Sequence, residues 1–364
     1  MSVYAFKLLA KGDKMKTIEL LTLVVKNGAS DLHITVGVPP VLRINGQLVK
    51  LDLPQLTPQD TEEITRDLLS SDELKKLEET GDIDLSYSVQ GLGRFRINAY
   101  KQRGTYSLAI RSVALRIPTI DELGLPEVIK ELSLKTRGLI LVTGPTGSGK
   151  STTLASMIDL INDVRNCHIL TLEDPIEYLH KHKKSIVNQR EIGHDALSYA
   201  SALRAALRED PDVILVGEMR DLETIQIAIT AAETGHLVLS TLHTIGSAKT
   251  IDRIIDVFPP YQQQQIKVQL SNVLEGIISQ QLLPKLDNSG RVVAVEVMIA
   301  TPAIRNLIRE GKSFQIQSMV QTGSKFGMMT MDMSISQLLK KNLISMDDAL
   351  TYCVDRENFS KLAL

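Results

Sequence analysis

The chain has 364 residues, of which 43% are hydrophobic and 23% charged, a balance typical of a globular protein that buries a sizeable core. Its formal net charge of -2 offers no general basic field to nucleic acid and counts against a DNA translocase. Its two cysteines, Cys167 and Cys353, are too few for a disulfide framework or a four-cysteine zinc site.

The amino-terminal stretch does not have the pattern of a targeting sequence. Residues 1–14 contain Lys7, Lys11 and Lys14, their apolar stretch is too short for a signal peptide, and they lack a small-residue cleavage site. The apolar runs of the chain fall short of the about 18–20 residues needed to span a bilayer. We therefore expect residues 1–14 to be an extension ahead of the first domain, and the protein to stay in the cytoplasm.

Residues 15–114 show the patterns of a small α+β domain. Residues 41–49 hold two short β-rich runs around Asn45-Gly46, a pair that accepts the positive φ angles of a tight hairpin turn. Thr57, followed by a proline and an acidic residue, predicts the start of a helix. Residues 94–100 alternate polar and apolar side chains, as expected of a half-buried strand.

Arginines recur on the predicted strands of this first domain, at Arg94, Arg96, Arg103 and Arg111. Arginine is well suited to clamping phosphate, and an arginine from a neighbouring subunit can complete a nucleotidase site. We take Arg94, Arg96 and Arg111 as candidate phosphate-sensing arginines. A row of arginines on one strand face is also common on an ordinary solvated surface, so both interpretations stay open.

Beyond residue 114 the period of the sequence changes. Residues 115–126 form a polar stretch punctuated by prolines, which we interpret as a linker. In residues 127–364 short apolar runs alternate with helical segments, and the tail from residue 301 is mostly helical; the apolar runs lie at residues 138–143, 169–172, 213–216 and 237–240. Continuous apolar runs predict parallel strands covered on both faces, and their alternation with helices predicts an α/β domain with right-handed crossovers.

Residues 144–151 match the phosphate-loop motif G-x-x-x-x-G-K-S, between a predicted buried strand and an amphipathic helix. Such glycines let backbone N–H groups surround phosphate oxygens at the positive end of the helix dipole. Lys150 is expected to reach the β- and γ-phosphates of ATP, and the Ser151 hydroxyl to bind Mg²⁺. The strand and helix on either side argue against a glycine-rich turn that binds nothing. The predicted nucleotide-binding residues are Gly144, Pro145, Thr146, Gly147, Ser148, Gly149, Lys150, Ser151 and Thr152.

A second buried strand, residues 213–216, leads into Gly217-Glu218. Many P-loop proteins have an aspartate here that holds Mg²⁺. We expect Glu218 to polarise the attacking water, directly or through the metal shell, and Gly217 to permit a close approach of substrate or backbone. The alternative is an ordinary helix-capping charge.

Three acids, Glu173, Asp174 and Glu177, follow another apolar strand. Ligands of open α/β sheets bind at the carboxyl ends of strands, so we select Glu173 as the general base. A solvated acidic turn is the competing interpretation.

Two histidines, His236 and His243, flank the predicted strand at residues 237–240. Their seven-residue separation places them on opposite faces of an extended segment, so they cannot together bind one metal ion from that strand. His243 is expected to sense the γ-phosphate. His236 is equally well explained as a buried, hydrogen-bonded histidine.

A short helix is predicted between Thr301, as its N-cap, and Gly311, as its left-handed carboxyl cap. Its apolar stripe faces one way, while Arg305 and Arg309 share another face. The segment consists of Ala303, Ile304, Arg305, Asn306, Leu307, Ile308, Arg309 and Glu310. It is either a docked surface helix with a solvated basic face, or an element whose basic face contacts another domain or a membrane partner and transmits movement.

Four motifs occur in a fixed order: the phosphate loop, the acidic segment 172–178, residues 207–221, and the histidine segment 235–244. Together they resemble the type II/type IV secretion and pilus ATPase superfamily. Residues 28–35, 303–310 and 321–325 are similar to its pilus-retraction members, and the resemblance covers nearly the whole chain from Met15.

The resemblance implies a PAS-like amino-terminal domain followed by a RecA-like ATPase domain. It implies a cytoplasmic homohexamer that hydrolyses ATP with Mg²⁺ to drive pilus disassembly and retraction, and hence twitching motility. Its implied partners are an inner-membrane pilus platform protein and a related retraction ATPase, with peripheral contact to the membrane machinery and no nucleic acid.

The resemblance also assigns roles to single residues. Glu218 becomes the Walker-B-type glutamate, Glu173 the acid of the aspartate box, and His243 the histidine-box residue. Arg94 and Arg96 match the region of the sensing arginines. The segment 303–310 becomes an element that couples hydrolysis to retraction.

Four alternatives are weaker. Extension and secretion ATPases of the same superfamily usually have a four-cysteine zinc element and a longer amino-terminal domain, and a second retraction paralogue is disfavoured by residues 303–310. A nucleotide-dependent scaffold that does not hydrolyse ATP is disfavoured by the intact Lys150 and Glu218, and a DNA translocase by the charge balance.

Overall fold

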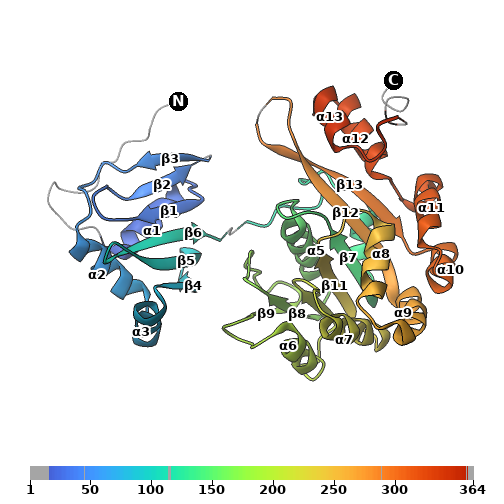
Figure 1. The fold of residues 1–364 in the computed structure, drawn as a ribbon, viewed down its shortest axis with the longest axis horizontal. Helices are drawn as coiled ribbons and strands as arrows, with labels where there is room; N and C mark the ends of the chain where they lie inside the picture. Colours follow the sequence, from blue (N-terminus) through green and yellow to red (C-terminus); the bar gives the residue numbers. More distant parts are fainter. Residues whose placement is uncertain (1–15, 45, 114–115, 288, 358, 360–364) are drawn as a thin grey trace. The chain divides into compact units, whose positions relative to one another are not determined.

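The structure is a computed structural model that describes residues 16–44, 46–113, 116–287, 289–357 and 359. The chain divides into two compact units, with the boundary between residues 115 and 116. The expected extension, residues 1–14, and Asn45 of the expected hairpin turn lie outside the described residues. Figure 1 shows the helices and strands of each unit.

The first unit is built on a six-stranded antiparallel sheet with the strand order β3-β2-β1-β6-β5-β4. Alternate side chains of the strands, such as Leu32, Phe95 and Ile110, are buried against the helices, as the two-residue period predicts. The expected α+β class is thus confirmed. The elements are α1 (Thr17–Lys26), β1 (Asp31–Ile34), β2 (Val41–Ile44), β3 (Gln47–Lys50), α2 (Pro58–Leu68), α3 (Ser71–Thr80), β4 (Asp82–Val89), β5 (Gly93–Gln102) and β6 (Thr105–Ser112).

The predicted local signals of this unit are found in the structure. β2 and β3 pair as a hairpin, and Gly46 in their turn has a φ of 82°. Thr57 caps α2: its hydroxyl accepts from the Asp60 N–H, and the Asp60 carboxylate accepts from the Thr57 N–H at 2.8 Å.

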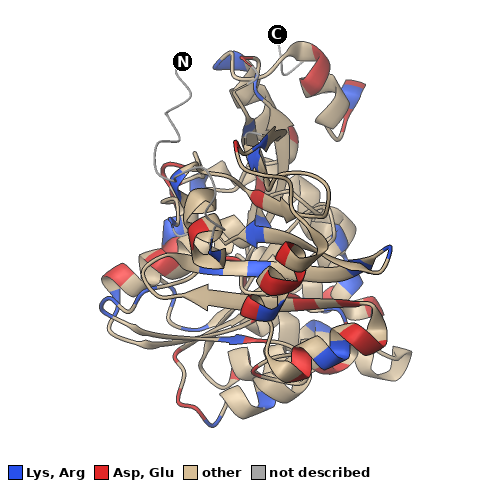
Figure 2. Ribbon diagram, turned by 90° about the vertical axis from the view of Figure 1, so that its left-hand side faces the viewer, with Lys and Arg blue, Asp and Glu red and all other residues tan. Residues whose placement is uncertain are grey.

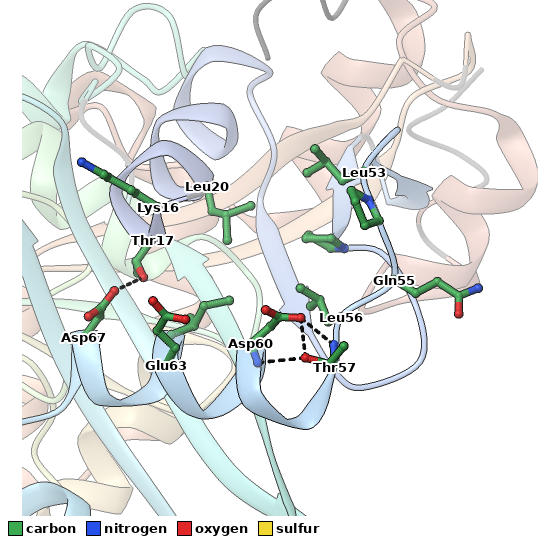
Figure 3. A pocket seen from close by; sticks show the side chains of 13 residues that line it. Lys16, Thr17, Leu20, Leu53, Gln55, Leu56, Thr57, Asp60, Glu63 and Asp67 are labelled. Atoms are coloured by element: carbon green, nitrogen blue, oxygen red, sulfur yellow. Dashed lines mark hydrogen bonds between the residues drawn. The ribbon is translucent and has the colours of Figure 1, made fainter. Parts of the chain in front are cut away.

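A cavity of 350 Å³ lies in this unit between α1, α2 and residues 53–57 (Figure 3). The hydroxyl of Thr17 donates to Asp67 at 2.7 Å, which ties α1 to α2 beside the cavity. Apolar side chains such as Leu20 and Leu56 line it together with the carboxylate of Glu63. None of the predicted nucleotide-site residues lines this cavity.

The second unit contains a seven-stranded sheet with the order β13-β12-β7-β11-β10-β8-β9. All neighbouring strands are parallel except the antiparallel pair β12 and β13. The four strands expected from apolar runs are confirmed, whereas β9, β12 and β13 were not predicted. The strands are β7 (Gly138–Thr143), β8 (His168–Glu173), β9 (Ile186–Glu191), β10 (Val213–Val216), β11 (Leu237–Leu242), β12 (Leu274–Pro284) and β13 (Arg291–Ile299).

Helices cover both faces of this sheet, which explains why its central strands are apolar throughout. Leu139 and Leu141 of β7 lie in one hydrophobic core, with helices α6 to α11, while Ile140 and Val142 lie in the other, with α4 and α5. The helices are α4 (Val128–Ser133), α5 (Lys150–Val164), α6 (Tyr199–Ala206), α7 (Leu222–Glu233), α8 (Ser247–Asp256), α9 (Pro260–Val273), α10 (Pro302–Glu310), α11 (Ile316–Thr322), α12 (Met331–Lys340) and α13 (Met346–Tyr352), with 3₁₀ turns at Ser313–Gln315 and Ser324–Phe326.

The stretch expected to be a linker packs against the second unit from residue 116 onward. Ile120 and Leu125 are buried in the core around α4 and α5, and the Ser156 hydroxyl donates to the Pro118 carbonyl at 2.6 Å. Two prolines in a polar stretch predict that the segment forms no regular helix or strand. They do not indicate whether the segment packs against a domain.

Basic and acidic residues are interspersed along the helices and strands of both units (Figure 2). Within the described part of the chain, the helices are all too short or too polar to cross a bilayer.

Candidate functional site

The predicted phosphate loop lies between β7 and α5. β7 is buried along its whole length, and α5 begins at Lys150. Gly144, Gly147 and Gly149 have φ angles of 141°, 77° and 89°, a backbone that residues with a Cβ rarely adopt. Such a loop turns successive N–H groups toward one side, where they can surround an anion.

Lys150 is 8% exposed, and its side chain lies across the loop. Nζ donates to the carbonyls of Gly144 at 2.9 Å and Pro145 at 3.0 Å. Burial lowers the pKa of Lys150, and the negative charge of Glu218 opposes this effect. Among the described residues, the Lys150 ammonium donates only to these two loop carbonyls, and it is well placed to bind the phosphates of a nucleotide instead.

The first turn of α5 offers two hydroxyls next to the loop. Ser151 is exposed, and the Thr152 hydroxyl is hydrogen-bonded to that of Tyr178 at 2.9 Å, which ties the acidic segment to α5. Among the described residues, there is no group of three or more His, Cys, Asp or Glu side chains that could hold a metal ion. A Mg²⁺ bound with a nucleotide needs no such group, because phosphates and water supply most of its ligands. The exposed Ser151 hydroxyl at the helix start fits that role.

Glu218 and His243 meet beyond the carboxyl ends of the adjacent parallel strands β10 and β11. The Glu218 carboxylate lies 2.6 Å from Nε of Arg220 and 3.5 Å from Nε2 of His243, and its side chain is 17% exposed. Two of the three predicted catalytic residues are therefore neighbours, and, against the lowering by burial, the negative charge of Glu218 raises the pKa of Lys150 in the phosphate loop.

Gly217 makes the close approach that was expected at this position. A Cβ here would lie 2.8 Å from the Tyr199 hydroxyl and 3.2 Å from the Leu172 carbonyl. A side chain at residue 217 would thus push the end of β10 away from β8. The glycine keeps Glu218 close to the acidic segment that follows β8.

Glu173, the predicted general base, is the last residue of β8. Its carboxylate accepts from the Thr171 hydroxyl at 2.6 Å and the Gln189 amide at 3.2 Å. Burial raises the pKa of Glu173, while these hydrogen bonds lower it. The interpretation as a solvated acidic turn does not describe this carboxyl, because it ends a strand and accepts hydrogen bonds from two side chains.

His236 lies at the opposite end of β11 from His243. Its Nδ1 is 2.9 Å from the Ala231 carbonyl and 3.2 Å from the Thr234 hydroxyl. The structure thus supports the hydrogen-bonded interpretation of His236 and keeps the two histidines apart.

The candidate arginines lie in the first unit. Arg96 and Arg111 are exposed and face each other across β5 and β6. Nε of Arg111 donates to Asp31 at 2.8 Å, and Arg94 is half-buried on the same face of β5 as Arg96. Arg103 lies in the turn after β5, with a φ of 52°. Their role in completing the nucleotide site stays a prediction.

The segment 303–310 forms α10 with the predicted ends, since Thr301 accepts from the Ile304 N–H and Gly311 is left-handed. The basic face is not as expected, because Arg305 does not lie in solvent. Its guanidinium donates to the carbonyls of Ala300, Ser271 and Asn272 and to Glu275, at distances of 2.7–2.9 Å; the side chain is 21% exposed. The interpretation as a solvated basic face therefore does not hold for Arg305, and the role of this face in transmitting movement stays a prediction.

Several polar residues of this unit were missed from the sequence. Gln280, on β12, donates to the phosphate loop, and Glu296, on β13, accepts two hydrogen bonds from Ser247 after the histidine segment. Their partners lie 132 and 49 residues away in the chain, so no local pattern signals these contacts.

The family described as Type II/IV secretion system protein matches residues 14–340. The chain belongs to this family. The resemblance inferred from its sequence motifs is thus confirmed, as is the expected α/β fold with a preceding α+β unit.

Some relatives match this chain over most of its length. The type IV pilus retraction ATPase PilT of Pseudomonas aeruginosa is 50% identical over 345 residues, which cover 95% of this chain and 100% of the relative. A twitching motility protein of Neisseria gonorrhoeae is 46% identical over 321 residues, 88% of this chain and 86% of the relative. A crystal structure of the pilus retraction motor PilT with bound ADP superposes with a TM-score of 0.89 at 52% identity, and covers 96% of this chain and 100% of that one.

Proposed function

We propose that this protein is a hexameric ATPase motor that hydrolyses ATP to drive type IV pilus disassembly and retraction. The observation that carries the proposal is the phosphate loop with its buried Lys150, in a chain that is 50% identical to PilT along that relative's entire length. The bound ADP named for the similar PilT structure supports nucleotide binding at this loop.

The loop N–H groups and Lys150 bind the β- and γ-phosphates of ATP. The Lys150 ammonium gives up its hydrogen bonds to the Gly144 and Pro145 carbonyls and donates to the phosphates instead. Glu218 orients the attacking water, and His243 beside it senses the γ-phosphate. Glu173, with its raised pKa, takes up the proton of that water. Ser151 would hold Mg²⁺ together with the phosphates, and the ion would supply charge neutralisation there.

We further propose that the motor works as a homohexamer in the cytoplasm, at an inner-membrane platform protein of the pilus and alongside a related retraction ATPase. Arg94, Arg96 and Arg111 complete the nucleotide site from the first unit or a neighbouring subunit. The exposure of Arg96 and Arg111 supports this role, because an arginine that clamps phosphate must be reachable.

The test compares wild type with Lys150→Ala and Glu218→Gln, both purified and in cells that lack the native gene. Lys150→Ala should abolish turnover, since it removes the buried cation whose ammonium lies against the loop and reaches the phosphates. Glu218→Gln should keep nucleotide affinity and lose hydrolysis, because it removes stabilisation of the transition state only. Neither variant should restore pilus retraction. Wild-type hydrolysis by Lys150→Ala, or pilus retraction in cells without the protein, would overturn the proposal.

A further inference from the structure

Gln280 contacts the phosphate loop from the neighbouring strand. It lies on β12 just beyond the pairing of Ser279 with Thr143, where β7 turns into the loop. Its side chain is 1% exposed, and Nε2 donates to the Ser148 carbonyl at 2.6 Å. Buried polar groups of this kind are kept when they satisfy a specific partner.

The partner has a direct bearing on phosphate binding. When loop N–H groups turn toward a phosphate, the carbonyls of the same peptides turn away from it and need their own partners. Lys150 occupies the carbonyls of Gly144 and Pro145, whereas Gln280 occupies that of Ser148. Fixing this carbonyl also fixes the peptide plane that presents the Gly149 N–H.

The close packing of β12 on the loop limits any other arrangement. A Cβ at Gly144 would lie 2.3 Å from the Gln280 carbonyl oxygen, and one at Gly149 would lie 3.2 Å from Gln280 Nε2. Two of the loop glycines thus make room for Gln280 itself. Because β12 is an inner strand of the sheet, it gives the loop a rigid support.

We propose that Gln280 is a positioning residue for nucleotide binding: it holds the Ser148 peptide so that the loop N–H groups are arranged for phosphate before the nucleotide arrives. This inference rests on the proposed function. Gln280 would join the residues that shape the nucleotide site, although it contacts the phosphate loop and not the reacting atoms. Gln280 therefore acts on affinity and leaves the chemical step alone.

The test is Gln280→Met in the full chain, which keeps side-chain length and removes the amide. The loss of a hydrogen bond to a buried carbonyl predicts a roughly tenfold weaker Kd for ADP and a similar rise in KM for ATP, with kcat at saturation nearly unchanged. Gln281→Met is the matched control, because Gln281 is the next residue on β12 and makes no hydrogen bond through its side chain with the described residues. It should bind ADP like wild type.

Gln280→Asn is the second variant, in case Gln280→Met does not fold. It keeps the amide but is one methylene too short to reach Ser148, and should weaken ADP binding to a similar extent. Wild-type ADP affinity in a folded Gln280 variant, an equal loss in Gln281→Met, or a fall in kcat with unchanged KM would each overturn the inference. If wild type itself binds no ADP, the proposed function fails instead, so the two failures are distinguishable.

Discussion

Arg305→Ala is expected to destabilise the second unit strongly, although the residue lies on a surface helix. Its guanidinium donates to the carbonyls of Ser271 and Asn272 near the end of α9, to the Ala300 carbonyl, and to Glu275. The ion pair of Arg305 with Glu275 is mostly shielded from solvent, because only 21% of the Arg305 side chain and 20% of the Glu275 side chain are exposed. A cation at the end of α9 also interacts favourably with the helix dipole.

The size of this loss in stability can be estimated from the number and kind of hydrogen bonds that Arg305 makes. Hydrogen bonds to charged groups contribute about 1.5–3 kcal/mol each, but they are not additive, and water can replace some of them at a partly exposed site. Lys135, 3.4 Å from Glu275, compensates part of the remaining charge. We therefore expect a loss of about 2–3 kcal/mol, or roughly 5–10 °C in the melting temperature of a unit of this size.

The assay is thermal unfolding of the full chain without nucleotide, followed by circular dichroism. Arg309→Ala is the control, because it removes the same charge from the same helix, and the Arg309 side chain makes no hydrogen bond or ion pair with the described residues. It should shift the melting temperature very little. Arg305→Lys should recover part of the loss, since an ammonium cannot reproduce the forked geometry. An Arg305→Ala variant with the same melting temperature as Arg309→Ala would refute the reasoning. Arg309→Ala is also the better variant for testing whether α10 couples hydrolysis to retraction, because we expect it to leave stability unchanged.

Two further predictions concern the second unit. Glu296→Ala should lower kcat while ADP binding persists, because Glu296 holds the start of α8 through the N–H and hydroxyl of Ser247, just after His243; unchanged kcat would contradict this. Burial lowers the pKa of His180 from 6.5 to about 4 in the folded protein. As the pH falls from 6.5 to 4, His180 is therefore protonated in the unfolded chain but not in the folded one. The free energy of unfolding should therefore be highest above pH 6.5 and fall by about 3 kcal/mol as the pH is lowered to 4. In a plot of the urea midpoint against pH, His180→Asn should remove this decrease. The same decrease in wild type and variant would contradict the prediction.

The sequence predicted those parts of the fold that depend on neighbouring residues. The caps of α2 and α10 and the phosphate loop each rest on a few consecutive side chains, and continuous apolar runs identified the four central strands. β12 was missed because its sequence combines apolar residues with Ser279, Gln280 and Gln281, so that it has neither a continuous apolar run nor a strict alternation.

The candidate site was predictable to the same extent. Glu218 and His243 each follow a recognisable strand, and parallel pairing brings such ends together. For Arg305, the helical period gave the correct face of α10 but could not show that α9 and β12 cover that face. Contacts between distant elements are set by tertiary packing, which local patterns do not encode.

β12 carries two side chains that bind different parts of the second unit. Near its start, Glu275 binds Arg305 of α10, and further along Gln280 binds the phosphate loop. The intervening residues span roughly 15 Å of extended chain, which is nearly inextensible. The phosphate loop and α10 are therefore held by the same strand, so a displacement of β12 along its axis would act on both hydrogen bonds at once.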